Sequence, residues 1–345
     1  MKKILSSLIA LCFFAFAQAQ APIAMLSHSG LHTPYYGTDA LVDAYAAAQN
    51  GDIITLSSGV FNACDIRKGI TLRGAGMMTD TVAGTLRTTI NGNFKLHNDN
   101  NGLSLTLEGL YIESEMYMDT IWNLQINKCF VNKFCNPWYS SQGVHNGTFT
   151  HSIFRDLRTA WLYNCNFYNC VLRENTGSGA DFYSSDNSTV CDHCIIQLRN
   201  TSGTTRFHST NSILLYDDPG IDPGHDQNNC LTHEYCIGIS HYGSYGDPFF
   251  HPGNYVSGQH LYSYLDCTDV FVDFNRDVSV FADYHLVDGV DTVCLGNDNT
   301  QVGIYGGSMP FNPSVNNPGI GHITVDGQTN SQGQLPVHIQ IINEQ

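Results

Sequence analysis

Four aspartates between residues 216 and 226 supply a dense set of oxygen ligands. Carboxylates in a loop are the ligands that calcium prefers in proteins. Aspartates among prolines and glycines are also typical of tight turns, where they accept hydrogen bonds from nearby backbone. The loop is therefore a candidate calcium site, although nothing in the sequence requires a cofactor. Its carboxylates are Asp217, Asp218, Asp222 and Asp226.

Two pairs of a histidine and an arginine are candidates for acid–base chemistry. Proton abstraction beside a uronate carboxylate needs a base and a cation that neutralises the carboxylate. His151 precedes Arg155, and Arg206 precedes His208, at spacings that suit one outward face of a strand. Ordinary surface residues give the same pattern, so the pairs are candidates and not an assignment.

Aromatic residues are frequent among glycines between Ser240 and Tyr264. Aromatic faces along a groove suit the stacking of sugars and of other amphipathic ligands. A long loop that packs its own aromatics onto the fold would have the same composition. The candidate substrate-binding residues of this segment are Tyr242, Tyr245, Phe250, His251 and Tyr255.

A repeat of short apolar runs must position these residues. The runs are separated by asparagine, glycine, aspartate and serine, and they align at spacings of 18 to 24 residues. A unit of this size holds two or three short strands and buries its apolar face only by stacking on its neighbours. The sequence therefore predicts an all-β, single-domain parallel solenoid. The aligned positions are Leu110, Cys129, Ser152, Cys170, Cys194, Ser212 and Cys236, and the earlier runs are Ile53–Leu56, Ile70–Leu72 and Thr88–Ile90.

The cysteines admit three interpretations. The first is a ladder of small buried residues, because cysteine alternates with serine at the aligned positions. The second is a disulfide joining Cys165 to Cys170, or Cys191 to a cysteine of another repeat. The third is zinc at Cys191-x-x-Cys194 with His193, which lacks a second cysteine pair and places the two cysteines on opposite faces if they share a strand. We favour the ladder.

The chain ends suggest export and a capped solenoid. Lys2 and Lys3, the apolar residues 4–16 and the small residues around position 19 form a secretory signal peptide with cleavage after Ala19. Loss of Cys12 from the 12 cysteines then leaves an odd number, so one thiol stays unpaired or pairs between chains. A lead segment covers residues 20–37, the solenoid covers 38–307 with an insertion at 240–264, and 308–345 is a β-rich tail or cap.

One helix is expected outside the signal peptide, over residues 39–49. Thr38 is its expected N-cap and Asn50-Gly51 its stop signal. Leu41 and Tyr45 lie on its apolar face, so the helix could close the first coil of the solenoid.

The negative net charge restricts the kinds of partner that the protein is expected to bind. The formal net charge is −16, and only 13% of residues are charged, so lysine and arginine are scarce. Nucleic acid and anionic membranes are disfavoured, because each phosphate contact needs a cation. No stretch after the signal peptide has the roughly 20 apolar residues of a membrane span. The expected location is extracellular, cell-surface or periplasmic.

Five segments resemble a known superfamily. Residues 38–56 and 69–76 are similar to the N-terminal cap and first coils of the pectate-lyase-like right-handed parallel β-helix proteins, and 247–250, 283–286 and 302–307 resemble their last coil. The resemblance implies the fold. It is nearly silent on chemistry, because the superfamily includes lyases, hydrolases, epimerases and adhesins. The polygalacturonase-type catalytic set is missing, since Asp217-Asp218 and Gly224-His225-Asp226 only echo it.

These observations lead to two functional hypotheses. The first is a secreted β-helix protein that binds an extracellular polysaccharide or cell-surface glycan, with cleavage by a lyase or hydrolase reaction left open. The alternative is a non-catalytic structural or adhesin-like surface protein, because a stacked solenoid forms a rigid rod without any active site.

Overall fold

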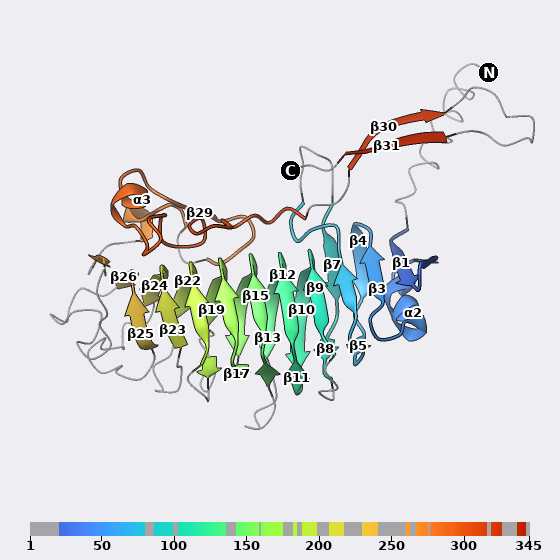
Figure 1. Ribbon diagram of the computed structural model, residues 1–345, viewed down its shortest axis with the longest axis horizontal. Coiled ribbons are helices and arrows are strands. Elements are labelled where there is room, and N and C mark those ends of the chain that lie inside the picture. Colours follow the sequence, from blue (N-terminus) through green and yellow to red (C-terminus); the bar gives the residue numbers. More distant parts are fainter. Residues whose placement is uncertain are drawn as a thin grey trace, which may run out of the picture.

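The computed structural model is an elongated parallel β-solenoid, and Figure 1 shows its coils stacked along the long axis. Three sheets run along the stack, and we name them A, B and C. The chain follows the same order in each complete coil, from C to A to B. The structure describes residues 21–79, 86–98, 103–135, 143–158, 160–174, 182–184, 188–198, 207–216, 230–240, 260–262, 267–274, 277–315, 319–325 and 337–342.

Sheet A has 11 strands, and each strand from β3 onward pairs in parallel with the strand one coil away. Its first two strands, β2 and β1, are antiparallel and lie at one end of the stack. The strands are β2 (Leu31–Tyr36), β1 (Ile23–His28), β3 (Ile53–Leu56), β6 (Thr71–Arg73), β9 (Leu105–Glu108), β12 (Leu124–Asn127), β15 (Thr148–Thr150), β18 (Asn166–Tyr168), β21 (Val190–Asp192), β23 (Phe207–Thr210) and β25 (Cys230–Glu234).

Sheet B has 12 strands, with β5 and β8 beside its main path. Its last strand, β27, lies inside the range 240–264 that the sequence marks as an insertion, so the sheet continues there. The strands are β4 (Gly59–Asn62), β5 (Asp65–Ile66), β7 (Thr88–Asn91), β8 (Phe94–Leu96), β10 (Tyr111–Met118), β13 (Phe130–Cys135), β16 (Ile153–Arg158), β19 (Val171–Glu174), β22 (Ile195–Leu198), β24 (Ile213–Tyr216), β26 (Ile237–Ser240) and β27 (His260–Tyr262).

Sheet C is the smallest, with 4 strands. Asparagines with positive φ at positions 123, 146 and 164 separate it from sheet A. The side-chain amides of Asn146 and Asn164 each donate to the asparagine one coil earlier, over 3.4 and 2.9 Å. The strands of the sheet are β11 (Ile121–Trp122), β14 (Val144–His145), β17 (Ala160–Tyr163) and β20 (Phe182–Ser184).

The turn between sheets A and B has one residue in the left-handed conformation in each coil from that of Gly109 to that of Tyr235. Asparagine and glycine adopt positive φ most easily, so their frequency at these turns has a direct cause. The following residue is the aligned position of the repeat, and each aligned residue is buried. The left-handed residues are Gly109, Lys128, His151, Asn169, His193, Asn211 and Tyr235, with φ between 48° and 65°.

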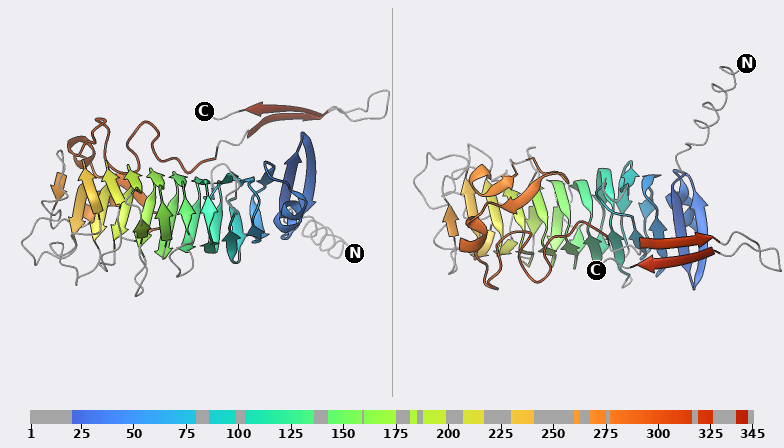
Figure 2. Two further views of the ribbon diagram at one scale, coloured as in Figure 1. Left: turned by 60° about the horizontal axis from the view of Figure 1, so that its bottom comes forward. Right: turned by 90° about the horizontal axis from the view of Figure 1, so that it is seen from above.

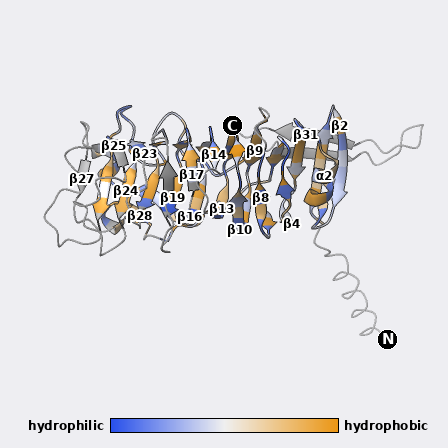
Figure 3. Ribbon diagram, turned by 90° about the horizontal axis from the view of Figure 1, so that it is seen from below, coloured by the Kyte–Doolittle hydropathy of each residue, from blue (hydrophilic) through white to orange (hydrophobic). Residues whose placement is uncertain are grey.

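The first core fills the inside of the solenoid, and apolar residues recur in its strands along the whole stack (Figure 3). Strands alternate inward and outward side chains, so every second residue enters this core. Phe149 and Phe167 stack in adjacent coils with ring centroids 4.4 Å apart. The predicted ladder of small residues is confirmed, because the cysteines and serines of the aligned positions are fully buried.

Helix α2 (Ala40–Ala47) lies within the predicted range and buries Ala40, Leu41 and Ala44. Its N-cap is Asp39 and not Thr38, and no side chain caps it. It contacts β1, β2, β3 and β4 at the end of the stack. Its role as a cap stays a prediction.

The C-terminal segment, from residue 267 to the strap described below, packs against the outside of sheet B and forms a second core there. The buried residues Phe130, Ile153 and Ile213 of sheet B belong to one apolar cluster with Phe271 and Phe274 of this segment. Figure 2 shows the segment lying along the coils when it is viewed from above. Residues 283–286 and 302–307, which resemble a last coil, belong to this outer layer. Its elements are η2 (Cys267–Asp269), β28 (Phe271–Asp273), antiparallel β29 (Asp283–Leu286) and α3 (Val290–Val293).

Residues 294–315, which we call the strap, then run back along the left-handed turns in reverse chain order. The turns at Asn211 and His193 both contact residues 297–307, and from Asn169 back to Gly109 each earlier turn contacts a later part of the strap. The tail beyond the strap includes the antiparallel pair β30 (Gly319–Val325) and β31 (Val337–Ile342). The contacts are Asn211 with Asn297 and Gly303, His193 with Thr300, Asn169 with Ile304 and Gly306, His151 with Met309, Lys128 with Ser314, and Gly109 with Val315.

Candidate functional site

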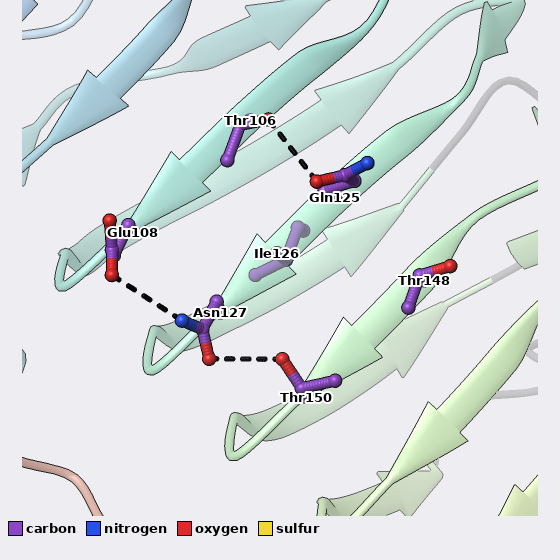
Figure 4. A pocket seen from close by; sticks show the side chains of 7 residues that line it. All are labelled: Thr106, Glu108, Gln125, Ile126, Asn127, Thr148 and Thr150. Atoms are coloured by element: carbon purple, nitrogen blue, oxygen red, sulfur yellow. Dashed lines mark hydrogen bonds between the residues drawn. The ribbon is translucent and has the colours of Figure 1, made fainter.

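A hollow of about 350 Å³ lies on the outer face of sheet A, where β9, β12 and β15 run side by side. We call it the sheet A groove. Outward side chains of these strands form two rows along the solenoid, as Figure 4 shows. The C-terminal segment packs on sheet B and leaves this face open. The lining residues are Thr106, Gln125 and Thr148 of the first row, Glu108, Asn127 and Thr150 of the second row, and Ile126.

Hydrogen bonds link the second row from coil to coil. The Thr150 hydroxyl donates to Asn127 Oδ1 over 2.9 Å, and Asn127 Nδ2 donates to Glu108 Oε1 over 3.5 Å. In the first row, the Thr106 hydroxyl donates to Gln125 Oε1 over 3.4 Å. Amides and hydroxyls can both donate and accept, and each amide nitrogen carries two hydrogens. The groove therefore presents orientated polar groups that remain able to bond a ligand rich in hydroxyls.

Glu108 is the single ionisable residue among the seven that line the groove. Its Oε2 accepts from Arg73 Nε over 2.7 Å, and Arg73 lies in β6, one coil earlier in the same row. Glycosidases use two carboxylates, and a lyase needs a base beside a neutralising cation. The residues of this groove supply neither arrangement, so its composition suits binding.

The structure does not bring His151 and Arg155 together. His151 occupies a left-handed turn, and its Nε2 lies 2.9 Å from the carbonyl oxygen of Met309 in the strap. Burial lowers the pKa of His151, while the bond to Met309 acts in the opposite direction. Arg155 lies in β16 of sheet B, where it donates to Asn132 over 3.4 Å. The expectation of a shared strand face is wrong, because a turn separates the two residues.

Of the second pair, only His208 lies within the described residues. It belongs to β23 of sheet A, and the pairing of strands places it in the first groove row, beyond Asn166 and Val190. Its Nδ1 is 2.7 Å from the hydroxyl of Thr232 in the next coil. Arg206 lies outside the described residues, so the pair stays a prediction.

Two predicted sites fall outside the described part of the chain. One is the candidate calcium loop with Asp217, Asp218, Asp222 and Asp226. The other is the aromatic segment, whose candidates are Tyr242, Tyr245, Phe250, His251 and Tyr255. Both stay predictions.

The cysteines of the aligned positions, Cys129, Cys170, Cys194 and Cys236, are buried free thiols. Each donates to the carbonyl oxygen two residues earlier over 3.2–3.3 Å. The proposed bridge between Cys165 and Cys170 is absent, since Cys170 is free, and none of these four pairs with Cys191.

The prediction that Cys191 and Cys194 lie on opposite faces is wrong. The turn at His193 separates the two residues, and both enter the inner core. Within the described residues, no three histidine, cysteine, aspartate or glutamate side chains gather as a metal site would need.

An aromatic stack on sheet C is a second candidate for sugar contact. Trp122, His145 and Tyr163 occupy successive coils, with ring centroids 4.0 and 4.3 Å apart and nearly parallel planes. Sugar stacking needs an open ring face. His145 has both faces covered by its two neighbours, so the stack serves the packing between coils better than it serves a ligand.

Sequence reasoning missed the sheet A groove, although the repeat contains its signal. The groove residues lie two and four positions before the aligned residues Leu110, Cys129 and Ser152. A threonine, an amide or a carboxylate stands at each of these positions. Extending the alignment upstream by four residues would have revealed the two polar rows.

The fold and the groove define the class of protein: a parallel β-solenoid with an open polar groove on one face and a C-terminal strap over another corner. None of the helices in the described ranges is long and apolar enough to cross a membrane. Comparison of the chain with protein-family models, curated proteins and solved structures finds no match.

Proposed function

We propose that this protein is a secreted β-helix of the pectate-lyase-like type that binds an extracellular polysaccharide in the sheet A groove without cleaving it there. The observation that carries the proposal is the lining of the groove, which consists of hydroxyls, amides and one paired carboxylate. Groups of this kind match the alternating donors and acceptors of sugar hydroxyls. The predicted signal peptide agrees with an extracellular ligand, and the resemblance of the N-terminal coils supports the proposed type of fold.

The shape of the groove also supports binding of a chain and not of a compact ligand. Its two rows continue from one coil to the next, so neighbouring units of a polymer would meet similar groups. The row that contains Gln125 extends through Asn166 to His208, which gives an extended ligand further polar contacts.

Binding measured by calorimetry and affinity electrophoresis with the mature chain tests the proposal. The probes are soluble glucans, xylans, mannans and galactans. The double substitution Gln125→Ala and Asn127→Ala should weaken binding about tenfold or more, because it removes two hydrogen-bonding groups. Thr55→Ala is the matched control, since Thr55 is an exposed residue of sheet A outside the groove.

Unchanged affinity in the double variant, or no binding of any probe by the unmodified chain, would overturn the proposal. New reducing or unsaturated ends in the bound polymer would overturn the non-catalytic part alone. Absence of all glycan binding would favour the alternative of a structural or adhesin-like surface protein, which rests on the rod shape of the solenoid (Figure 1).

A further inference from the structure

We infer that the sheet A groove selects an uncharged glycan over a uronate and holds it along the solenoid axis with about one sugar per coil. The inference rests on the proposed function and adds the class and the direction of the ligand. It is drawn from the spacing of the two polar rows and from the charges in and beside them.

The spacing of groups along each row is the reason to expect the sugar chain to lie along the solenoid axis. Thr106, Gln125 and Thr148 are direct neighbours across the parallel strands, as are Glu108, Asn127 and Thr150 in the second row. Neighbouring strands lie about 4.8 Å apart, which is comparable to the length of one sugar in an extended chain. A chain laid along the axis therefore meets a first-row and a second-row group at each sugar.

The carboxylates in and beside the groove are the reason to expect a preference for an uncharged polymer. The carboxylate of Glu108 is inside the groove, and the second row continues through Tyr168 to the carboxylates of Asp192 and Glu234. A uronate polymer would place its own carboxylates beside this row, and like charges oppose binding. A neutral chain meets no such repulsion.

The nearby cations are already engaged. Arg73 forms its ion pair with Glu108 at 2.7 Å. Lys128 follows Asn127 at the turn, but its Nζ donates to the carbonyl oxygen of Ser314 in the strap over 2.6 Å. A bound uronate would compete with Glu108 for Arg73, whereas Lys128 keeps its charge and two further hydrogens but is held by the strap at Ser314. None of the seven described residues that line the groove is a cation.

Two polymers that differ only in charge make the test specific. The first is a soluble β-glucan, and the second is the same glucan oxidised at C6 to the uronate. The mature chain should bind the neutral polymer at least about tenfold more tightly at low salt. Raising the salt from about 10 to about 300 mM should narrow the difference, because screening weakens the repulsion. Short oligosaccharides of the neutral glucan should gain affinity with each sugar up to about three units, the number of strands that line the hollow.

Two variants that each remove one carboxylate test whether Glu108 causes the preference for the neutral polymer. Glu108→Gln should narrow the ratio of neutral to uronate affinity by about fivefold. Glu113→Gln removes the same charge from an exposed position in β10 of sheet B and should leave the ratio unchanged. Circular dichroism checks folding, and the salt titration of the unmodified chain tests the selectivity independently of any variant.

The outcomes separate the inference from the proposed function. Equal or tighter binding of the uronate, weakened by Gln125→Ala and Asn127→Ala, would overturn the selectivity and leave polysaccharide binding in place. A gain in affinity that stops at one sugar would overturn the direction along the axis. Binding of both polymers that ignores the groove substitutions would overturn the proposed function, and this inference with it.

Discussion

The side-chain amide of Asn169 donates to the carbonyl oxygen of Ile304 over 2.9 Å, which fixes the strap to a turn in the middle of the solenoid. The same amide donates to Gly306 over 2.9 Å. Asn169 is buried, and its backbone is left-handed with φ of 50°. One residue therefore shapes the turn and satisfies two carbonyl groups of a distant segment.

Replacing this amide should loosen the strap. Asn169→Gly keeps the left-handed turn accessible but leaves two carbonyl groups without their donor, at a cost of about 1–3 kcal/mol in the free energy of unfolding. Urea denaturation measures the loss, and limited proteolysis within residues 294–315 localises it. Asn146→Gly is the control, because Asn146 is an exposed left-handed asparagine whose amide bonds to the side chains of Asn123 and Asn164 and not to the strap. Equal losses in the two variants would contradict the role of the buried amide.

The attachment of the strap at Met309 should depend on pH through His151. Burial is the main cause that lowers the pKa of this imidazole in the folded chain. The unfolded chain, with a pKa near 6.5, then binds more protons, so stability is full above about pH 6.5 and falls as the pH drops through the folded pKa. The protection of the residues around Met309 against hydrogen exchange, relative to the intrinsic exchange rate at each pH, should therefore fall on acidification.

His151→Asn is the matching control, since asparagine accepts a left-handed turn and does not titrate. This variant should lose the change in protection against exchange near Met309 between neutral and mildly acidic pH. A response as large as that of the unmodified chain would assign the pH dependence to another group.

The ladder thiols should be inert in the folded protein. Burial raises the pKa of Cys129 to about 12 and that of Cys236 to about 11. Reaction requires the thiolate, so a thiol reagent at about pH 8 should label these two residues only after denaturation. Peptide mapping by mass spectrometry identifies the labelled positions. Rapid labelling of Cys129 in the folded chain would contradict its place in the inner core.

A methyl group at Gly306 should displace the strap. A Cβ built there would collide with the carbonyl oxygen of Gln301 and with the ring of His193. Gly306→Ala should therefore destabilise the chain by more than Gly289→Ala, where φ is positive but the space around the new methyl group is open. The expected cost at Gly289 is about 1 kcal/mol. Thermal unfolding of both variants decides the comparison.

The repeat was readable from the sequence because it depends on local rules. Buried residues at the aligned positions recur once per coil, and the early runs at Ile53–Leu56 and Thr88–Ile90 coincide with β3 and β7 within a residue. The left-handed residue before each aligned position was not predicted, because lysine and tyrosine occur there as well as asparagine, histidine and glycine.

The second core and the strap were beyond the reach of the sequence. Residues 283–286 and 302–307 have the alternation of a further coil, but they pack on the outside of sheet B through contacts more than a hundred residues away. Periodicity shows that a segment has an apolar face, and it does not show which surface covers that face. His151 and Arg155 were misplaced for a related reason, because their short spacing concealed a turn between two sheets.

Because the strap contacts successive turns in reverse order, its length is matched to the number of coils beneath it. Its residues 304–315 match the turns from Asn169 back to Gly109, one coil after another. A coil gained or lost between these turns would still stack on its neighbours, yet it would shift every later contact out of step. The length of the strap thus restricts how many coils this part of the chain can hold, a restriction that stacking alone does not impose.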